Sequence, residues 1–400
     1  MNDAFNKPKS EKSQESLLAI GEQIQVLLES AKEKQASAPK ESIQLFTEII
    51  ALTNETDDQI SMRAEALYLK SLLLRRLGDA THALEDARLA LSLYSSLNNS
   101  IGAAKSLNAI GIALENLGDY EQALECYQKI LTLCQELNDE RIVAGALSNI
   151  GNIFNKQSNY NKALDYHQKS LSIRRKLGDK NAVAISLSNI GLIYSNFSDY
   201  TQALDCYQQS LLIREEIGDK EGIAIALNNI GIVYETLTDF SNALRLYQNA
   251  LAFTQEMGNQ FAEVRLLNNI GNICYRLRDF ANATASYQKA LYLSQQNGDK
   301  LGMAMSQHNI GMVNADLSSY QQALICYEMC IQICQEIGNK EGIASAQAGL
   351  GKVHFQMKKI AKAIEHLRIS LDMSIDIGSK LLEIQACLFL GKCYAREQSD

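Results

Sequence analysis

The chain has 400 residues, 46% of them hydrophobic, and 38 Lys and Arg against 46 Asp and Glu give a formal net charge of −8. This acidic balance argues against nucleic acid or an anionic membrane as the main partner, since both favour a basic protein surface. No apolar run is long enough to span a membrane, and the polar start lacks a signal-peptide pattern. We therefore expect a cytoplasmic protein that does not insert into a membrane.

The first 60 residues show only a weak version of the pattern that dominates the rest of the chain. We expect residues 1–14, which are mostly polar, to form a disordered tail, and residues 15–60 to form a degenerate helix pair. The only two prolines of the chain, Pro8 and Pro39, lie here, so no proline ring interrupts a helix after residue 39. The remaining sequence is expected to be all-helical.

From residue 61 the sequence repeats with a period of 40 residues. The stretch LSNIGLIYSNFSDYTQALDCYQQSL at 187–211 returns as LNNIGIVYETLTDFSNALRLYQNAL at 227–251. We predict eight repeats over residues 61–380, followed by the unpaired helix of a ninth at 381–400, a possible truncation point. Such an array favours one elongated solenoid over separate globular domains. One column holds glycine throughout: Gly111, Gly151, Gly191, Gly231, Gly271, Gly311, Gly351 and Gly391.

Each repeat contains two segments with helical periodicity, which we call its first and second helix. In residues 181–220, Leu187, Ile190 and Tyr194 recur at steps of three and four, which places them on one face of the first helix. Asp119 followed by Gln122 predicts a capping box at the start of a second helix. A glycine closes most repeats and suits a left-handed helix end, as at Gly178, Gly218, Gly258, Gly298, Gly338 and Gly378.

The glycine inside the first helix needs a reason, because glycine costs about 1 kcal/mol relative to alanine there. We interpret it, with the alanine of the second helix, as a small residue that lets the two helix backbones approach closely. Tyrosines such as Tyr127, Tyr207 and Tyr247 would then fill the groove beside them.

At these columns the chain resembles the tetratricopeptide repeat family, in which the first helix carries a large apolar residue, Leu-Gly and Tyr, and the second carries Ala, an aromatic residue and Ala. The resemblance covers residues 61–400 strongly and 15–60 loosely. The 40-residue period exceeds the usual length of about 34, as in kinesin light chains, Pins-type adaptors and bacterial signalling proteins of this family. The resemblance implies an all-α, right-handed superhelical solenoid of antiparallel helix pairs.

In this family the concave groove lined by the first helices usually holds a peptide or a helical segment of a partner. The family's groove columns lie six, three and two residues before the glycine, and one, four and five after it. An asparagine column can bind a peptide backbone through its two donors and one acceptor, or it can bond to the neighbouring repeat and only order the array. The candidate groove residues are Asn149, Asn152, Lys156, Asn189, Asn229, Arg265, Asn269, Asn272, Tyr275, Arg276 and Asn309.

The family's carboxylate clamp is incomplete in this sequence. It needs two lysines, an arginine and two asparagines over three consecutive repeats, and only the asparagine pairs are present, as Asn152 with Asn189 and Asn272 with Asn309. The positions for the cations hold Ser148, Ile225 and Asn229, or Asn268, Ser345 and Gly349. Binding of a chaperone C-terminus is therefore not expected.

No residue pattern predicts catalysis, a metal or a cofactor. The nine cysteines form no CxxC pair, which favours a reducing compartment. Cys326, Cys330 and Cys334 share one helix side and could hold a soft metal, but Cys330 falls in a column of small residues, so we interpret them as core. The five histidines lack metal-ligand spacing, and AGLGKV at 348–353 lacks the P-loop pattern.

These observations predict a non-enzymatic scaffold for protein–protein interaction. The alternative is a sensor array that regulates a cyclase, kinase or transcription-regulator domain beyond residue 400. A peptide-responsive receptor of the pheromone-binding type is less favoured, because residues 1–60 look too short for the extra helical bundle of such receptors. Leu390, Gly391 and Tyr394 lie in columns that should face a second helix, so the apolar C-terminal edge also suggests self-association.

Overall fold

The computed structural model describes residues 9–53, 56–137 and 139–397, and all regular elements in these ranges are α-helices. Residues 1–8 of the expected tail lie outside the described residues, and residues 9–14 belong to the first helix. The helices are α1 (Lys9–Ser37), α2 (Pro39–Leu52), α3 (Asp57–Arg76), α4 (Ala80–Ser96), α5 (Ser100–Leu117), α6 (Tyr120–Leu137), α7 (Glu140–Lys156), α8 (Tyr160–Lys176), α9 (Lys180–Asn196), α10 (Tyr200–Ile217), α11 (Lys220–Thr236), α12 (Phe240–Glu256), α13 (Gln260–Arg276), α14 (Phe280–Asn297), α15 (Lys300–Asp316), α16 (Tyr320–Glu336), α17 (Lys340–Gln356), α18 (Ile360–Asp376) and α19 (Lys380–Glu397).

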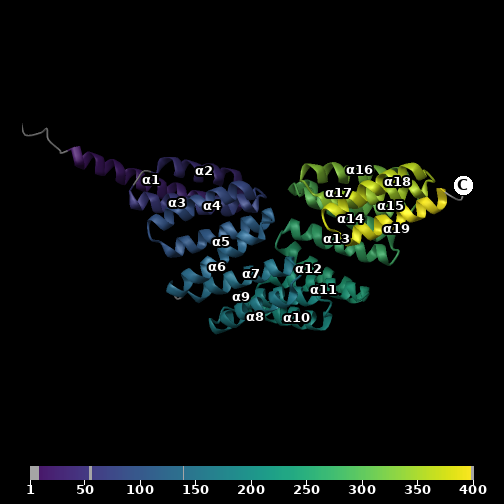
Figure 1. Cartoon of the computed structure of the whole chain (residues 1–400), viewed down its shortest axis with the longest axis horizontal. Helices are drawn as coiled ribbons and strands as arrows, with labels where there is room; N and C mark the ends of the chain where they lie inside the picture. The colour runs from purple at the N-terminus through teal and green to yellow at the C-terminus, as the bar shows by residue number, and fades with distance from the viewer. Residues whose placement is uncertain (1–8, 54–55, 138, 398–400) are drawn as a thin grey trace, which may run out of the picture. The chain divides into compact units, whose positions relative to one another are not determined.

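The chain divides into two compact units, Met1–Asp199 and Tyr200–Asp400, and each is a stack of helix pairs (Figure 1). Within each unit consecutive helices pack together, and several odd-numbered helices also contact one another, such as α3 with α5 and α13 with α15. From α3 onward the odd-numbered helices are the first helices of the repeats. The predicted fold class, an all-α solenoid of antiparallel helix pairs, is confirmed.

The ends of the helices follow the sequence signals, with two exceptions. The six glycines predicted to close the repeats have φ between 67° and 72°, and after five of them the next residue caps the following helix with its side chain, as when Asp219 Oδ1 accepts from the Gly222 backbone N–H at 2.9 Å. The turn inside a repeat also uses a left-handed residue, which is glycine in the first two repeats, at Gly78 and Gly118, and another residue type in the later ones, as at Thr238 and Lys358. The capping-box expectation is wrong in one detail, because the Gln122 side chain donates to the Asp119 carboxylate at 2.5 Å rather than bonding to the backbone.

An aromatic ring, not a neighbouring backbone, occupies the space beside the glycine of most first helices. A Cβ added at Gly271 would lie 2.4 Å from Cε1 of Tyr287, whose side chain is fully buried. The same ring contact recurs at Gly111 with Tyr127, at Gly231 with Tyr247 and at Gly311 with Tyr327. The glycine is therefore required because the tyrosine of the second helix lies directly on the first helix, as the predicted filling by tyrosine implies. At Gly351 an added Cβ would also lie 3.2 Å from the Ala363 backbone oxygen of the second helix, which is the close backbone approach that we expected.

We predict opposite effects for alanine at two glycines of the same column. Gly271→Ala should lower the free energy of unfolding by about 1–3 kcal/mol, because the new methyl group clashes with the buried ring. Gly391→Ala meets no atom within 4 Å, so it should stabilise α19 by up to about 1 kcal/mol through helix propensity. Urea unfolding followed by circular dichroism measures both, and equal effects would contradict the ring contact.

His167 replaces tyrosine in the first compact unit and makes folding sensitive to acid. Its side chain is 1% exposed, lies on Gly151, and has Nδ1 3.4 Å from the Ser148 hydroxyl. Burial, with a smaller contribution from Arg174, lowers the pKa of His167 to about 4. The folded chain therefore keeps this imidazole neutral at a pH where the unfolded chain protonates it.

Stability should consequently fall as the pH drops from about 6.5 toward 4, because only the unfolded state gains this proton, and the loss from His167 should reach about 3 kcal/mol. In His167→Tyr this acid-dependent loss should shrink, whereas the exposed control His82→Gln should keep it. Unfolding curves measured at pH 7 and pH 4.5 separate the two variants. An unchanged pH dependence in His167→Tyr would exclude the buried imidazole as the cause.

Candidate functional site

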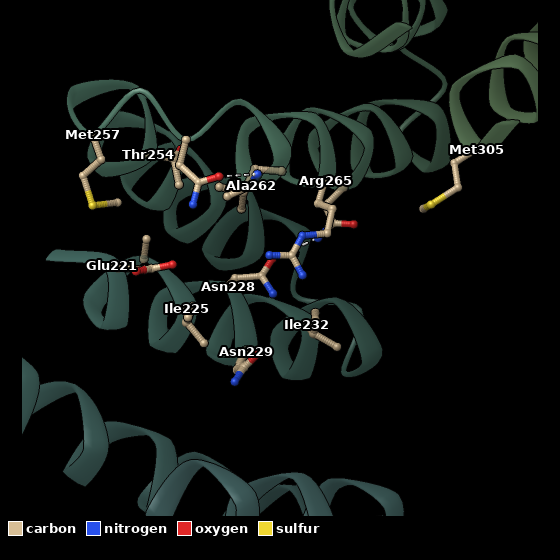
Figure 2. A pocket seen from close by; sticks show the side chains of 14 residues that line it. Glu221, Ile225, Asn228, Asn229, Ile232, Thr254, Met257, Ala262, Arg265 and Met305 are labelled. Carbon is tan, nitrogen blue, oxygen red and sulfur yellow. Dashed lines mark hydrogen bonds between the residues drawn. The ribbon is translucent and has the colours of Figure 1, made fainter. Parts of the chain in front are cut away.

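The first helices of the second compact unit carry two adjoining hollows. The α11–α13 hollow has a volume of about 340 Å³, and its wall includes Ile225, Asn229 and Ile232 of α11, Arg265 and Asn269 of α13, and Met305 of α15. Figure 2 shows these side chains around the opening, with the Arg265 guanidinium beside Asn228. Three of the candidate groove residues, Asn229, Arg265 and Asn269, thus line one hollow.

The second hollow, which we call the α15–α19 hollow, has a volume of about 580 Å³. Its wall includes Leu301, Met305, His308 and Met312 of α15, together with Leu381 and Gln385 of α19, and the candidate residues Asn272 and Asn309. A further hollow of about 300 Å³ shares His308, Met312, Ser345 and Gln385 with it. Met305 lines both the α11–α13 and the α15–α19 hollow, so the two adjoin at this side chain.

Three of the candidate asparagines are bonded to the preceding repeat. In each case the side-chain Nδ2 donates to the Oδ1 of an asparagine 41 residues earlier. The pairs are Asn149 to Asn108 at 2.7 Å, Asn269 to Asn228 at 3.0 Å, and Asn309 to Asn268 at 2.9 Å. The partner is a side chain and not the backbone. Asn272 accepts from the Tyr287 hydroxyl at 2.8 Å. Within the described ranges, Asn152, Asn189 and Asn229 are half-buried and make no side-chain hydrogen bond, so only these amides stay available for a ligand.

Carboxylates on the first helices are paired with a phenol and a cation. Glu115, whose side chain is 8% exposed, accepts from the Tyr127 hydroxyl at 2.6 Å and from Lys156 Nζ at 3.1 Å. Lys156 comes from the next repeat, so this group joins two repeats. The same arrangement recurs at Glu235 with the Tyr247 hydroxyl at 2.9 Å and Arg276 Nε at 3.7 Å.

Asp316 forms a third group of this kind in the second compact unit. It accepts from the Tyr275 hydroxyl at 2.6 Å, and Lys352 Nζ lies 3.6 Å from its other oxygen. Burial, followed by the hydrogen bond to Asp316, raises the pKa of Tyr275 to about 12. The candidates Lys156, Tyr275 and Arg276 are therefore engaged within the protein, which their positions in the repeat did not indicate.

Arg265 differs from these cations. Its side chain is exposed, and no carboxylate of the described residues lies within ion-pair distance. It shares the column six residues before the glycine with Ile225, Met305, Ser345 and Gln385, all of which line the hollows. Our list of candidates contained only Arg265 from this column. The changing residue type of the column, against the near-constant asparagines, was the signal that we missed.

Two of the three cysteines of α16 are part of the core, whereas Cys326 is half-buried. Cys330 and Cys334 are 2% and 1% exposed, and their Sγ atoms lie 4.0 Å apart. Burial raises the pKa of both thiols. In the part of the chain that the structure describes, no three His, Cys, Asp or Glu side chains are grouped to hold a metal ion. None of the described helices combines the length and apolar composition that crossing a membrane requires.

Stacked helix pairs with a recessed surface on their first helices define the class of helical-repeat proteins that act as interaction scaffolds. A family model described as tetratricopeptide repeat matches residues 62–136, 142–211, 183–256, 263–336 and 302–376, more than half of the chain. The chain therefore belongs to the tetratricopeptide repeat family. Members of this family are typically non-enzymatic scaffolds with protein or peptide partners.

Solved structures with similar folds include aspartyl phosphate phosphatase F from Bacillus subtilis, at 13% identity and TM-score 0.60, covering 96% of this chain and 97% of that one. The apo quorum sensor NprR from B. thuringiensis has 13% identity and TM-score 0.58, with coverage of 88% and 99%. A Rap protein complexed with Competence and Sporulation Factor has 13% identity and TM-score 0.56, with coverage of 94% and 98%. At these identities the likeness shows the fold alone. No curated protein matches the sequence.

The coverage of these structures removes one of our arguments. We considered residues 1–60 too short for a peptide-responsive receptor, yet the match spans nearly the whole of the quorum sensor. Chain length therefore gives no reason to set that class aside, although the shared fold does not establish it.

We predict that engaged and available asparagines differ in their effect on stability. Asn309→Ala should lower the free energy of unfolding by about 1–2 kcal/mol, because the substitution removes the hydrogen bond that Asn309 donates to the buried Asn268. Asn229→Ala should change it by less than about 0.5 kcal/mol, as is usual away from such contacts. Chemical unfolding of the two variants measures the difference, and comparable losses would mean that Asn229 is also bonded within the array.

Proposed function

We propose that the chain is a non-enzymatic scaffold that binds a peptide or helical segment of a partner protein on the surface of its first helices. The main contact site is the pair of hollows in the second compact unit. The observation that carries this proposal is that the two hollows adjoin at Met305, so that their walls together extend from α11 to α19. We also propose that the protein acts in the cytoplasm, since its cysteine pattern suits a reducing compartment.

The composition of the hollows suits a polypeptide ligand. Apolar side chains such as Ile225, Ile232 and Met305 stay 41–42% exposed on this surface, where a partner's side chains would cover them. The free amide of Asn229 can bond to a peptide backbone. The paired carboxylates Glu115, Glu235 and Asp316 are held by phenols and cations, an arrangement that orders the array.

Some earlier expectations stay predictions. Asn152 and Asn189 of the first compact unit have available amides but belong to no hollow described above. Self-association through the C-terminal edge was expected from Leu390, which is only 7% exposed and packs with Ala363 and Leu367 of α18. The exposed apolar side chains of α19 are instead Leu381, Ile384 and Leu388, at 57–68%. Similarity in fold to a quorum sensor and to a Rap protein supports a role in signalling. No observation on the described residues favours the alternative of a sensor array for a catalytic domain beyond residue 400.

A selection of displayed random peptides on the full-length protein tests this function. Met305→Glu places a charge at the junction of the two hollows, and it should weaken binding of the selected peptides at least tenfold without changing the melting temperature. Met329→Glu is the matched control, because Met329 is 42% exposed on α16 against 41% for Met305. Peptides that bind Met305→Glu as tightly as the wild type would place the binding site elsewhere.

A further inference from the structure

We propose that one residue in each first helix of the second compact unit reads the side chains of the bound peptide. These residues form the column six positions before the glycine, which we call the reading column: Ile225, Arg265, Met305, Ser345 and Gln385. The column selects a peptide with a carboxylate side chain opposite Arg265 and apolar side chains opposite Ile225 and Met305. This inference rests on the proposed function and specifies the chemistry of its ligand.

The reading column both varies and stays accessible, as does the column one residue after the glycine, which adds Ile232 and Met312 to the same hollows. Each member of the reading column lines a hollow, one from each of α11, α13, α15, α17 and α19. Figure 2 shows the first three, Ile225, Arg265 and Met305, on successive first helices. Ile225 and Met305 are each 41% exposed. By contrast, the asparagine column four residues later is nearly constant, and Asn269 and Asn309 are bonded to the preceding repeat.

Arg265 gives the column its charge preference. The nearby cations Arg276 and Lys352 already face carboxylates, at 3.7 Å from Glu235 and 3.6 Å from Asp316. Arg265 has no such partner within the described residues, so a carboxylate from the ligand would be its first. An arginine that meets a carboxylate in a recess forms a stronger pair than one on an open surface.

Glu221 also lines the α11–α13 hollow, but at some distance from Arg265 (Figure 2). Its carboxylate repels an acidic side chain of the ligand from the Glu221 end of the hollow, so that such a side chain is favoured at the Arg265 end. The hollow is therefore polarised, which fixes where the acidic side chain of a peptide lies. The two charges also keep the net charge of this wall near zero, so the preference depends on position rather than on overall attraction.

The wall on the other side of Met305 favours an apolar side chain. Leu301 and Met312 line it, and His308 packs edge-on against Tyr327 with ring centroids 5.3 Å apart. Burial lowers the pKa of His308 to about 4, so its imidazole is neutral at pH 7. An apolar side chain can therefore enter without covering a cation. Met305 and Met312 have flexible, polarizable side chains that adapt to different apolar groups.

The spacing of the helices sets the spacing of the motif. The first helices α13 and α15 pack against each other, packed helices lie about 8–10 Å apart, and an extended peptide rises about 3.3 Å per residue. The step from Arg265 to Met305 therefore corresponds to about three residues of an extended ligand. The expected motif has an acidic residue with a bulky apolar residue about three positions away on the Met305 side and a second apolar residue on the Ile225 side.

Exchanging two members of the reading column tests the inference on the full-length protein with a displayed random-peptide library. The wild type should select Asp or Glu with an apolar residue about three positions away on the Met305 side. In the double variant Arg265→Met with Met305→Arg, the acidic position should shift by about three residues along the motif. Arg265→Glu should select Lys or Arg at the former acidic position and bind the wild-type peptides at least tenfold more weakly.

The controls distinguish this inference from the proposed function. Selected peptides should keep their affinity when their C-terminus is amidated, because the carboxylate belongs to a side chain; loss of binding would overturn the inference. Two further results would overturn the inference about the reading column and leave the scaffold function in place. In the first, the selected peptides need Met305 but show no preference for an acidic residue. In the second, the exchange of Arg265 and Met305 leaves the selected motif unchanged. Failure to select any peptide would count against the scaffold function itself.

Discussion

The packing of a buried aromatic ring on a helical glycine is the contact on which the rest of the array depends. Tyr247 lies on Gly231 within one repeat, and its hydroxyl donates to Glu235 at 2.9 Å. Glu235 in turn faces Arg276 of the next repeat. Packing inside a helix pair is thus coupled to pairing between repeats, because the ring that fills the glycine site also fixes the carboxylate that receives the next cation. A side chain at the glycine would displace the ring and disturb both contacts.

This coupling decides which parts of the surface can recognise a ligand. The asparagine ladder and the carboxylate groups look like ligand contacts in a sequence, since they are polar and lie on the first helices. In the structure most of them hold one repeat to the next, as Asn309 does with Asn268 and Lys156 with Glu115. The function that we propose assigns recognition to side chains that no neighbouring repeat engages, such as Arg265, Asn229 and the apolar residues around Met305.

The sequence predicted the helices and their ends well because these depend on local signals that recur in each repeat. The glycines at φ near 70° and the aspartate caps are examples. It did not predict left-handed non-glycine residues such as Thr238, because only the fixed length of the turn between packed helices imposes that conformation. It also could not separate engaged from available polar groups, since the partner of Asn269 lies in another repeat. The hollows arise from side-chain volumes on four or more helices at once, which periodicity does not report.

The residues that order the array and the residues available to a ligand are different ones. This explains how such an array can change its ligand without losing its fold. Residues that order the repeats, such as Asn268 and Tyr287, are buried and bonded, so most substitutions there cost stability. Members of the reading column have exposed side chains, as at Arg265 and Met305, and exposed positions away from such contacts tolerate exchange within about 0.5 kcal/mol. Specificity can therefore vary from repeat to repeat along this column while the ring on the glycine keeps the geometry constant. A repeat protein can therefore determine which partner it binds through a column of this kind. Such a column is accessible, differs from repeat to repeat and can be substituted with little loss of stability.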